Sequence, residues 1–350
     1  YNMSEFVKKL EQSIDRLNKK ENKIYFLVQN TKGNIKGAVR YIYQMSLALI
    51  QNDFNVTILH EDEDFKNLSE SLGEEYNVIP HMCITNPDLK VSPEDTIVIP
   101  EIFGYVMDQI SNLPCEKIVL CQAYDNIFET LKPGSTWSEL GFKRVITTSE
   151  KQQELVSSIM RNNTYSVIEP TLSDAFSKKK LPSKPIVSIL TRDQRDTMKI
   201  IKTFYIKYPQ FRWITFRDMR GLNEHEFSEY LKDSFVSVWV DDISGFGTFP
   251  LESMATGTPV IGKVPNLKPE WLTEDNGIWT YENNDMVDII SEFTQNWLED
   301  NISEKIYEEG YKTSERFLDY EKFKNSVVSY FEELNDKKIN LFTERLSGVE

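Results

Sequence analysis

Residues 244–261 constrain the fold more than any other part of this chain. Their letters, SGFGTFPLESMATGTPVI, predict a tight loop, a short helix and a buried strand in succession. Gly245 and Gly247 let the backbone turn sharply and come close to a ligand, and Gly257 suits the end of the helix. This arrangement is typical of α/β proteins that hold a phosphorylated ligand at a helix N-terminus.

Glu252 lies one turn into the predicted helix. The exposed N–H groups at the start of such a helix favour an anion, while a carboxylate nearby could accept hydrogen bonds from neutral sugar hydroxyls. Alternatively, Glu252 only complements the helix dipole, which contributes ~0.3 to 1 kcal/mol. These residues taken alone leave both interpretations open.

The same segment resembles the C-terminal signature of the retaining, nucleotide-sugar-dependent glycosyltransferases of family 4, which have the GT-B fold. The family pattern is Glu, seven residues and Glu, with Gly-Phe-Gly after the first Glu and an Ala-x-Gly-x-Pro-Val ending. The resemblance implies that Glu252 binds the ribose hydroxyls of the nucleotide. It also assigns the donor-binding loop to Gly245, Phe246, Gly247 and Thr248.

The chain departs from the family pattern at Ser244, where the first Glu belongs. That Glu usually contacts the donor sugar, and a neutral hydroxyl cannot replace its charge. Ser244 remains a catalytic candidate by position, together with Glu252. Asp241 and Asp242 lie just upstream, where they either supply a carboxylate through a re-routed loop or are simply solvated.

Bulk properties set the class of protein. A chain of 350 residues predicts two domains, and no apolar run approaches the roughly 18 residues of a membrane span. Three cysteines without CxxC spacing argue against a disulfide framework or a zinc site. The formal net charge of −15 opposes nucleic-acid binding. Because of this charge we expect no nucleic-acid partner, and because no signal peptide is visible we expect a cytoplasmic protein.

Residues 1–22 are expected to form an amphipathic helix ahead of the main fold. Phe6, Leu10, Ile14 and Leu17 recur at helical spacing among charged residues. The helix either packs on the protein itself or touches a membrane on its cytoplasmic face. Its acidic residues argue against the second alternative, because interfacial helices favour Lys and Arg.

Residues 23–175 are expected to form the first α/β domain. An apolar run at 24–28, a Gly-containing loop, a helical pattern and a second apolar run at 56–59 predict a βαβ unit and hence a parallel sheet. The loop resembles the family's glycine loop, which makes Gly33 and Gly37 candidates for approach to the donor diphosphate or the acceptor. Loop glycines needed only for chain geometry are the alternative.

The acceptor side is suggested by residues 119–125, VLCQAYD. They resemble a family segment in which a polar residue after a central strand faces the cleft between the domains. On that basis Gln122, Tyr124 and Asp125 are the candidate acceptor-binding residues.

Residues 173–185, rich in Ser, Lys and Pro, are typical of a linker and are expected to lead to a second α/β domain at 186–314. In the family, the first strand-to-helix junction of this domain carries an Arg and, five positions later, a Lys, which hold the donor diphosphate. Arg192 matches the Arg, whereas the Lys position is Thr197. Lys199 and Arg195 are therefore weaker candidates. Strand ends hold the nucleotide base in the family, which suggests Phe216, Arg217 and Asp218.

Residues 315–350 are helical by pattern, and in GT-B proteins the final helix crosses back to the first domain. The expected fold class is therefore α/β, with two Rossmann-like doubly wound domains facing a cleft. The resemblance implies a glycosyltransferase that moves a sugar from a UDP- or GDP-sugar to a glycan, lipid-linked or protein acceptor, with retention and without a metal or other cofactor. A non-catalytic GT-B accessory subunit, a sugar-nucleotide epimerase and a phosphorylase are the alternatives. Nothing in the sequence indicates an oligomeric state.

Overall fold

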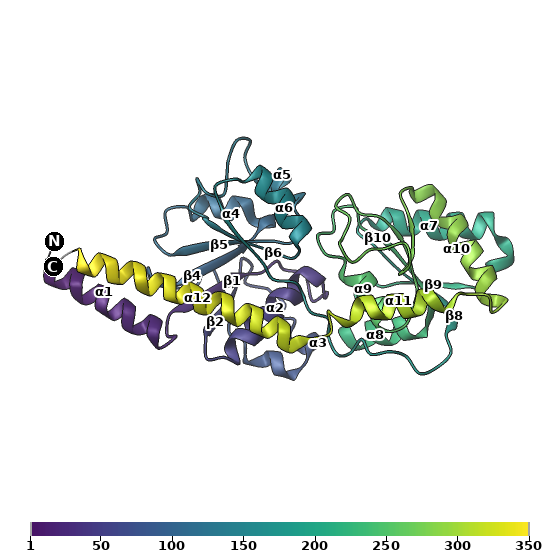
Figure 1. The fold of residues 1–350 in the computed structure, drawn as a ribbon, viewed down its shortest axis with the longest axis horizontal. Coiled ribbons are helices and arrows are strands. Elements are labelled where there is room, and N and C mark those ends of the chain that lie inside the picture. The colour runs from purple at the N-terminus through teal and green to yellow at the C-terminus, as the bar shows by residue number, and fades with distance from the viewer. Residues whose placement is uncertain (1, 349–350) are drawn as a thin grey trace. The chain divides into compact units, whose positions relative to one another are not determined.

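The computed structural model describes residues 2–348, which fall into two compact units. Unit 1 comprises the chain up to Glu169 together with the residues from Glu321 onward, and unit 2 runs from Pro170 to Tyr320. Each unit is a parallel sheet with helices on both of its faces (Figure 1). This is the doubly wound α/β architecture that the sequence predicts.

Unit 1 contains, among its described residues, a seven-stranded sheet in the order β3-β2-β1-β4-β5-β6-β7, and every pairing is parallel. Its strands are β1 Lys23–Leu27, β2 Asn55–His60, β3 His81–Cys83, β4 Thr96–Pro100, β5 Glu116–Cys121, β6 Arg144–Thr147 and β7 Thr164–Val167. The central strands β1, β4 and β5 are buried almost throughout. Continuous apolar runs suit such strands, because helices cover both faces of a parallel sheet.

The helices of unit 1 include the long C-terminal helix as well as those that follow its strands. They are α1 Met3–Asn18, α2 Gly37–Ile50, α3 Ser69–Leu72, α4 Gly104–Gln109, α5 Asn126–Thr130, α6 Glu150–Ile159 and α12 Tyr320–Ser347, with 3-10 turns at Glu74–Val78 and Glu101–Phe103. The expected return of the last helix to the first domain is confirmed, because all of α12 beyond Tyr320 belongs to unit 1. Its Phe331 ring packs edge-on against Phe26 of β1 at 6.2 Å between centroids.

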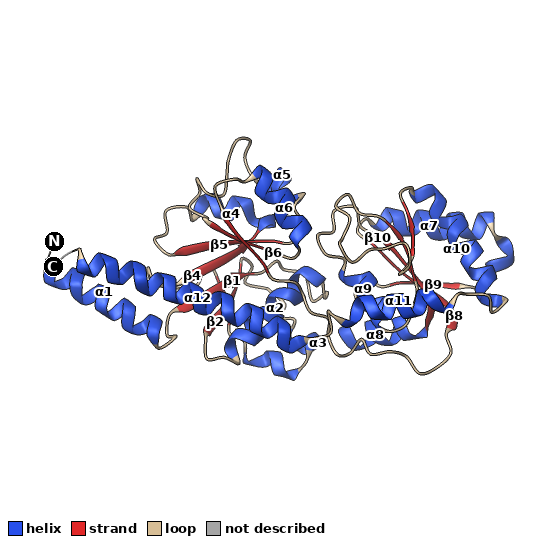
Figure 2. Ribbon diagram, viewed as in Figure 1, coloured by secondary structure: helices blue, strands red, loops and turns tan. Residues whose placement is uncertain are grey.

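Helix α1 lies along α12 (Figure 2). Leu10 and Leu17 of α1 form a buried cluster with Phe342 of α12, and Phe6 and Ile14 pack against it. The apolar stripe of the helix predicted within residues 1–22 therefore packs against the protein itself. Over residues 2–348, no helix is both long and apolar enough to cross a membrane.

Unit 2 contains, within the residues described, a five-stranded parallel sheet in the order β12-β11-β10-β8-β9. Its strands are β8 Lys184–Thr191, β9 Thr215–Asp218, β10 Ser234–Val240, β11 Val260–Lys263 and β12 Ile278–Thr280. Its helices are α7 Gln194–Lys207, α8 Glu224–Asp233, α9 Thr248–Ala255, α10 Asn283–Leu298 and α11 Glu304–Glu315, with a 3-10 turn at Pro209–Phe211. All seven residues of β10, the central strand, are buried.

The boundary between the units lies earlier than the composition suggests. Unit 2 begins at Pro170, so residues 173–185 belong to it. Leu172 and Phe176 lie in its hydrophobic core, and the ammonium of Lys179 donates to Ser183 Oγ, the Ser234 carbonyl and Thr258 Oγ1. A Lys- and Ser-rich composition is typical of a linker, but here the Lys179 ammonium is partly buried and hydrogen-bonded to three oxygens.

Candidate functional site

The carboxyl end of strand β10 leads into the loop and helix that the sequence singles out. After Val240 the chain turns through Asp241–Gly247 and enters α9 at Thr248. Gly247 is the N-cap and has φ 90°, a left-handed conformation that favours glycine. The predicted succession of loop, short helix and strand is present, since β11 follows α9 after a turn at Gly257.

A cluster of three tryptophans, Trp239, Trp271 and Trp279, packs beside this loop. A Cβ placed on Gly247 would lie 2.7 Å from Cζ2 of Trp271, so only glycine fits there without a shift. Trp271 Nε1 donates to the Phe246 carbonyl at 2.8 Å, and its ring packs on Trp239 and Trp279. The glycine at 247 therefore has a structural cause as well as the functional role suggested for it.

Glu252 and Ser244 are both buried near this loop. Glu252 is 3% exposed in the second turn of α9, and its backbone carbonyl accepts from Thr256 N within the helix. Ser244 is buried, with its N–H donating to the Asp241 carbonyl at 3.4 Å. A buried carboxylate is costly unless it has polar partners. Both interpretations of Glu252, a contact to the ligand and complementation of the helix dipole, stay predictions.

Arg192 lies directly after strand β8 and is held by a carboxylate from the neighbouring strand. Its Nε donates to Asp241 Oδ1 at 2.6 Å and its Nη2 donates to Asp241 Oδ2 at 3.0 Å. This fork geometry is the strong form of an arginine–carboxylate pair. The Arg192 side chain is still 49% exposed, so part of its guanidinium faces solvent.

Asp242 has a different partner from Asp241. Its carboxylate pairs with Lys263 at the end of β11, at 2.9 Å, and its backbone carbonyl accepts from Asn266 N. The sequence left two alternatives for Asp241 and Asp242, a carboxylate for the site or a solvated residue. In the structure each of them pairs with a cation at the carboxyl edge of the sheet. The crevice at this edge is where open α/β sheets bind ligands.

A second arginine, Arg220, lies at the same edge and was not anticipated from the sequence. It follows strand β9, and its Nη1 contacts both carboxylate oxygens of Asp218 at 3.0 and 3.2 Å. Its Nη2 donates to the carbonyl and hydroxyl of Thr191, the last residue of β8. Its signal in the sequence is a cation two residues after a strand, whereas Arg192 directly follows one.

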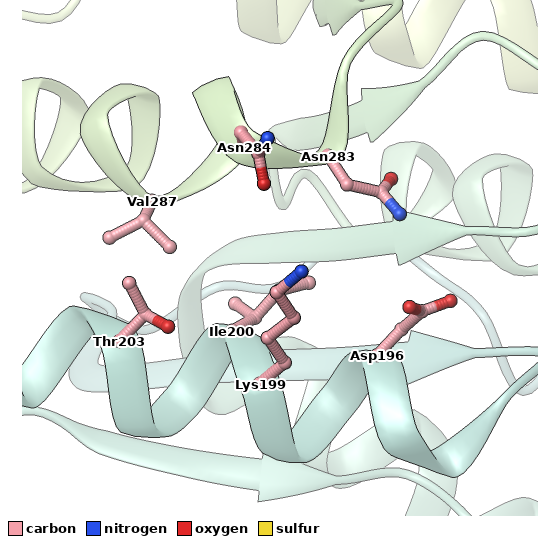
Figure 3. Close-up of a pocket in the computed structure, with 7 residues that line it drawn as sticks. All are labelled: Asp196, Lys199, Ile200, Thr203, Asn283, Asn284 and Val287. Atoms are coloured by element: carbon pink, nitrogen blue, oxygen red, sulfur yellow. The ribbon is translucent and has the colours of Figure 1, made fainter.

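Thr197 stands where the family pattern has its Lys. It is fully buried, its hydroxyl lies 2.6 Å from that of Thr191, and it accepts from Arg220 Nη1 at 3.3 Å. Lys199 lies further along α7, in a small groove between α7 and the start of α10 (Figure 3). That groove is also lined by Asp196, Ile200, Thr203, Asn283, Asn284 and Val287.

Arg195 and the predicted base-binding residues have other surroundings. Arg195 pairs on the surface with Asp193, two residues away, and hydrogen bonding from Arg195 lowers the pKa of the Asp193 carboxyl. Phe216 packs into the core against Phe204 and Tyr205. Arg217 extends to the other face, over the Tyr230 ring. The base-binding role of these strand residues stays a prediction.

Unit 1 brings the glycine loop and the predicted acceptor segment together. Gly37 begins α2, and the side chain of Gln122 donates from Nε2 to the Ala38 carbonyl at 2.9 Å. Tyr124 and Asp125 follow in the turn before α5, where burial and then Asp125 raise the pKa of the Tyr124 hydroxyl. Gly33 has φ 88° in the loop after β1.

Glu101, directly after β4, hydrogen-bonds the predicted acceptor segment. It was not among the residues predicted from the sequence. It is buried, and its Oε1 accepts from the backbone N–H groups of Gln122 at 2.5 Å and Ala123 at 2.7 Å. Its Oε2 accepts from Asn126 Nδ2 at 3.3 Å. Burial raises the pKa of this carboxyl, while the hydrogen bonds oppose that shift.

No cluster of three or more His, Cys, Asp or Glu residues within the described range could hold a metal ion. The cations described at the carboxyl edge of the unit 2 sheet are protein side chains. They are Arg192, Arg220 and Lys263, each paired with an aspartate. Each of these pairs is formally neutral, so an anionic group bound at this edge would contact the N–H groups that the aspartates leave open.

We compared the chain with protein families, with characterised proteins and with solved structures. No protein-family model matches this chain. It is 21% identical over 201 residues to an alpha-1,6-glucosyltransferase of Actinobacillus pleuropneumoniae, a match that covers 56% of this chain and 60% of that protein. The chain thus matches less than two thirds of that relative's length.

Several solved structures share the fold. Sucrose-phosphate synthase from Thermosynechococcus elongatus aligns with a TM-score of 0.66 at 14% identity, over 89% of this chain and 99% of that one. The pneumococcal O-GlcNAc transferase GtfA, in complex with UDP and GlcNAc, aligns with a TM-score of 0.62 at 10% identity, over 91% and 99%. Anabaena HepE in complex with UDP-glucose aligns at 0.61 and 15%, over 89% and 99%. The expected GT-B fold, two parallel-sheet α/β domains, is thereby confirmed.

Proposed function

We propose that this protein is a glycosyltransferase that transfers a sugar from a nucleoside diphosphate donor, with UDP as the carrier, to a hydroxyl of a glycan, lipid-linked or protein acceptor. The observation that carries the proposal is the carboxyl edge of the unit 2 sheet. There the exposed Arg192 fork and the loop into α9, with Glu252 buried behind it, share the segment that starts at Asp241.

The chemistry of the donor matches this edge. Asp241 occupies the Nε–Nη2 edge of Arg192, so the remaining N–H groups on Nη1 and Nη2 are those that offer bidentate hydrogen bonding to a diphosphate. The N-terminus of α9 adds N–H groups at the positive end of the helix dipole. When the bond between the sugar and the phosphate breaks, negative charge grows on the leaving diphosphate. Positive groups that are already in place stabilise that charge without reorganising.

The carbohydrate preference is inferred from relatives. The partial relative is described as an alpha-1,6-glucosyltransferase, and the HepE structure contains UDP-glucose. We therefore propose glucose, or its 2-acetamido derivative as in the GtfA complex, as the transferred sugar. The family resemblance supports transfer with retention, in which the acceptor hydroxyl attacks the face that the leaving phosphate vacates.

Ser244 is the strongest argument for the second candidate, a non-catalytic accessory subunit. Without the first Glu, the hydroxyls of the donor sugar lack a carboxylate as hydrogen-bond acceptor. A buried polar group without a hydrogen-bond partner costs ~1 to 3 kcal/mol. Neither Asp241 nor Asp242 is free to replace it, since each is paired with a cation. We therefore propose altered sugar recognition rather than loss of turnover, because the arginine fork that serves the leaving group is intact.

Calorimetric titration with UDP, GDP, UDP-glucose and UDP-N-acetylglucosamine tests the proposal. We expect UDP and at least one UDP-sugar to bind, and R192Q to weaken binding by about tenfold or more, as for loss of a charged hydrogen bond. R195Q is the matched control, because Arg195 lies at the same junction but pairs only with Asp193. Failure of every nucleotide to bind at millimolar concentration would instead favour the accessory subunit.

A further inference from the structure

Two stretches of unit 2 contain no acidic residue, although the chain as a whole is acidic. Residues 175–192 and 197–217 hold ten Lys and Arg residues and no Asp or Glu, whereas the full chain has 55 acidic against 40 basic residues. The two stretches contain β8, most of α7 and most of β9. Positive charge gathered on one part of an acidic protein indicates an anionic partner for that part.

The parallel topology brings parts of both stretches to the amino edge of the unit 2 sheet, opposite the edge that carries the candidate site. β8 starts at Lys184 and β9 at Thr215, and Ile186 lies opposite Thr215 in the register. The segment before β8 and the turn between α7 and β9 therefore meet at this edge. Lys184 also pairs at 3.4 Å with Asp233, the last residue of α8 before β10.

Three large apolar side chains are exposed at the amino edge. Leu181, three residues before β8, and Ile206, in the last turn of α7, are both 78% exposed, and Trp213, two residues before β9, is 51% exposed. Exposed aliphatic side chains add little to the binding of a soluble polyanion, but they gain free energy on entering a lipid interface. Tryptophan is enriched at the level of the lipid headgroups.

Each of these apolar residues has an exposed basic residue beside it. The three cations are Lys180 before Leu181, Lys202 one helical turn before Ile206 on the same face of α7, and Arg212 before Trp213. The combination of exposed apolar side chains and cations on one surface is typical of proteins that bind an anionic bilayer.

The acidic residues at the amino edge come from other segments. The carboxylates of Asp233 and Asp288 are each paired with a lysine of this edge. Glu299 and Asp300 follow α10, whose Trp297 stacks on Phe235 at the start of β10. These acids border the surface on its β10 side and leave the β8 and β9 side basic.

We propose that the β8 and β9 side of this amino edge binds the surface of a bilayer that contains anionic lipid. Leu181, Ile206 and Trp213 enter the headgroup level, and the three cations beside them contact the lipid phosphates. Arg192 lies at the opposite end of β8, so a bilayer bound here leaves the carboxyl edge open. The inference does not depend on the proposed function, because it involves none of the residues assigned to the donor.

Sedimentation of the full chain with vesicles tests the proposal. We expect binding to an equimolar mixture of phosphatidylcholine and phosphatidylglycerol that weakens with added salt, and little binding to phosphatidylcholine alone. K180Q/K202Q/R212Q should weaken it by about a hundredfold and I206S/W213S by about tenfold or more. The matched controls K8Q/K9Q/K19Q and M3S/L341S change exposed residues of α1 and α12 and should bind like the wild type.

Trp213 also reports directly on insertion. Among residues 2–348 it is the one exposed tryptophan, since the other five are buried or half-buried. We expect vesicles of the same composition made with brominated lipid to quench the fluorescence of the wild type and to leave that of W213F nearly unchanged.

The remaining outcomes would each overturn the proposal. Wild-type binding by K180Q/K202Q/R212Q, or a loss confined to the α1 and α12 controls, would exclude this edge as the membrane surface. A loss in the basic variant without quenching, and with I206S/W213S unaffected, would indicate a soluble polyanion instead. A wild-type dimer that ignores vesicles and that I206S/W213S dissociates would assign the edge to a second copy of the chain.

Discussion

Arg192 donates two hydrogen bonds to the carboxylate of Asp241. The two residues directly follow the neighbouring strands β8 and β10. The Nε to Oδ1 distance is 2.6 Å and the Nη2 to Oδ2 distance is 3.0 Å. Since Arg192 N also donates to the Val240 carbonyl at 2.9 Å, backbone and side chain together set the direction of the guanidinium. Asp241 therefore orients the Arg192 guanidinium in the absence of a ligand.

This geometry predicts that R192K fails to replace arginine. Lysine keeps the charge but cannot form the fork, so we expect UDP affinity to fall by about tenfold or more. The melting temperature should hardly change, because exposed ion pairs contribute only about 0 to 1 kcal/mol. Calorimetry and thermal scans on R192K and R195K measure both effects. Wild-type affinity in R192K would show that no bidentate contact to the ligand exists.

The sequence predicts the fold well because the signals for it are local. Apolar runs mark the buried strands, and Gly247 and Gly257 mark the ends of α9, where both have positive φ. Parallel order follows from strands that alternate with helices. The short strands β3 and β7 are only partly buried, so their apolar signals are too weak to predict them.

The candidate site is harder to predict because its contacts cross between strands. Arg192 and Asp241 are 49 residues apart, and Arg220 meets Thr191 across 29 residues. The family resemblance suggests Arg192 after β8 and Phe216 and Arg217 in β9, but it carries no information on contacts between strands. The side chains of those two residues of β9 pack onto opposite faces of the sheet.

E252Q separates a ligand contact from a structural role. Because Glu252 is buried, truncation to Ala would also leave a cavity, whereas Gln keeps nearly the same volume. We expect E252Q to lower UDP affinity by about tenfold or more, since hydrogen bonds to a charged acceptor are the stronger ones. Its melting temperature should stay close to that of the wild type. Retained affinity with a marked loss of stability would assign Glu252 to the protein interior alone.

Gly247 and Gly257 form a matched pair for testing the loop before α9. Both have positive φ, but only at 247 would a Cβ collide with Trp271, at 2.7 Å, whereas at 257 the nearest atom is Lys178 Cγ at 3.7 Å. G257A should cost about 1 to 3 kcal/mol from backbone strain, and G247A more than that. Differential scanning calorimetry of both variants measures the difference. Equal losses of stability in the two variants would mean that Trp271 can shift to accommodate an added methyl group at no cost.

E101Q tests whether the buried carboxylate orders the acceptor segment. A glutamine has one oxygen acceptor, so its amide NH2 would face either the Asn126 donor or both backbone N–H groups. We expect faster hydrogen exchange at Gln122 and Ala123 and a loss of about 1 to 3 kcal/mol of stability. E129Q, which changes an exposed residue of α5, should do neither. Unchanged protection in E101Q would show that β5 and α5 hold the segment without Glu101.

Lys338 couples the stability of the fold to pH. Its ammonium is buried in α12, where it donates to the carbonyls of Glu94 and Asp95 and to the Thr96 hydroxyl, and burial lowers its pKa to about 8. In the unfolded chain the amine returns to the ordinary lysine pKa of 10.5. Between these values the unfolded chain holds a proton that the folded protein has lost, so raising the pH favours the folded state. Below about pH 8 the amine is protonated in both states, and the effect levels off.

K338M removes this titration while keeping a long apolar side chain. We expect the free energy of unfolding of the wild type, relative to K338M, to rise between about pH 8 and 10 by up to ~1.4 kcal/mol per pH unit. Taking the difference between the two proteins cancels the tyrosines and carboxylates that titrate in both. Urea titrations monitored by tryptophan fluorescence at several pH values give that difference. A pH-independent difference would mean that the Lys338 amine keeps its proton in the folded protein throughout this range, with its three oxygen acceptors compensating for burial.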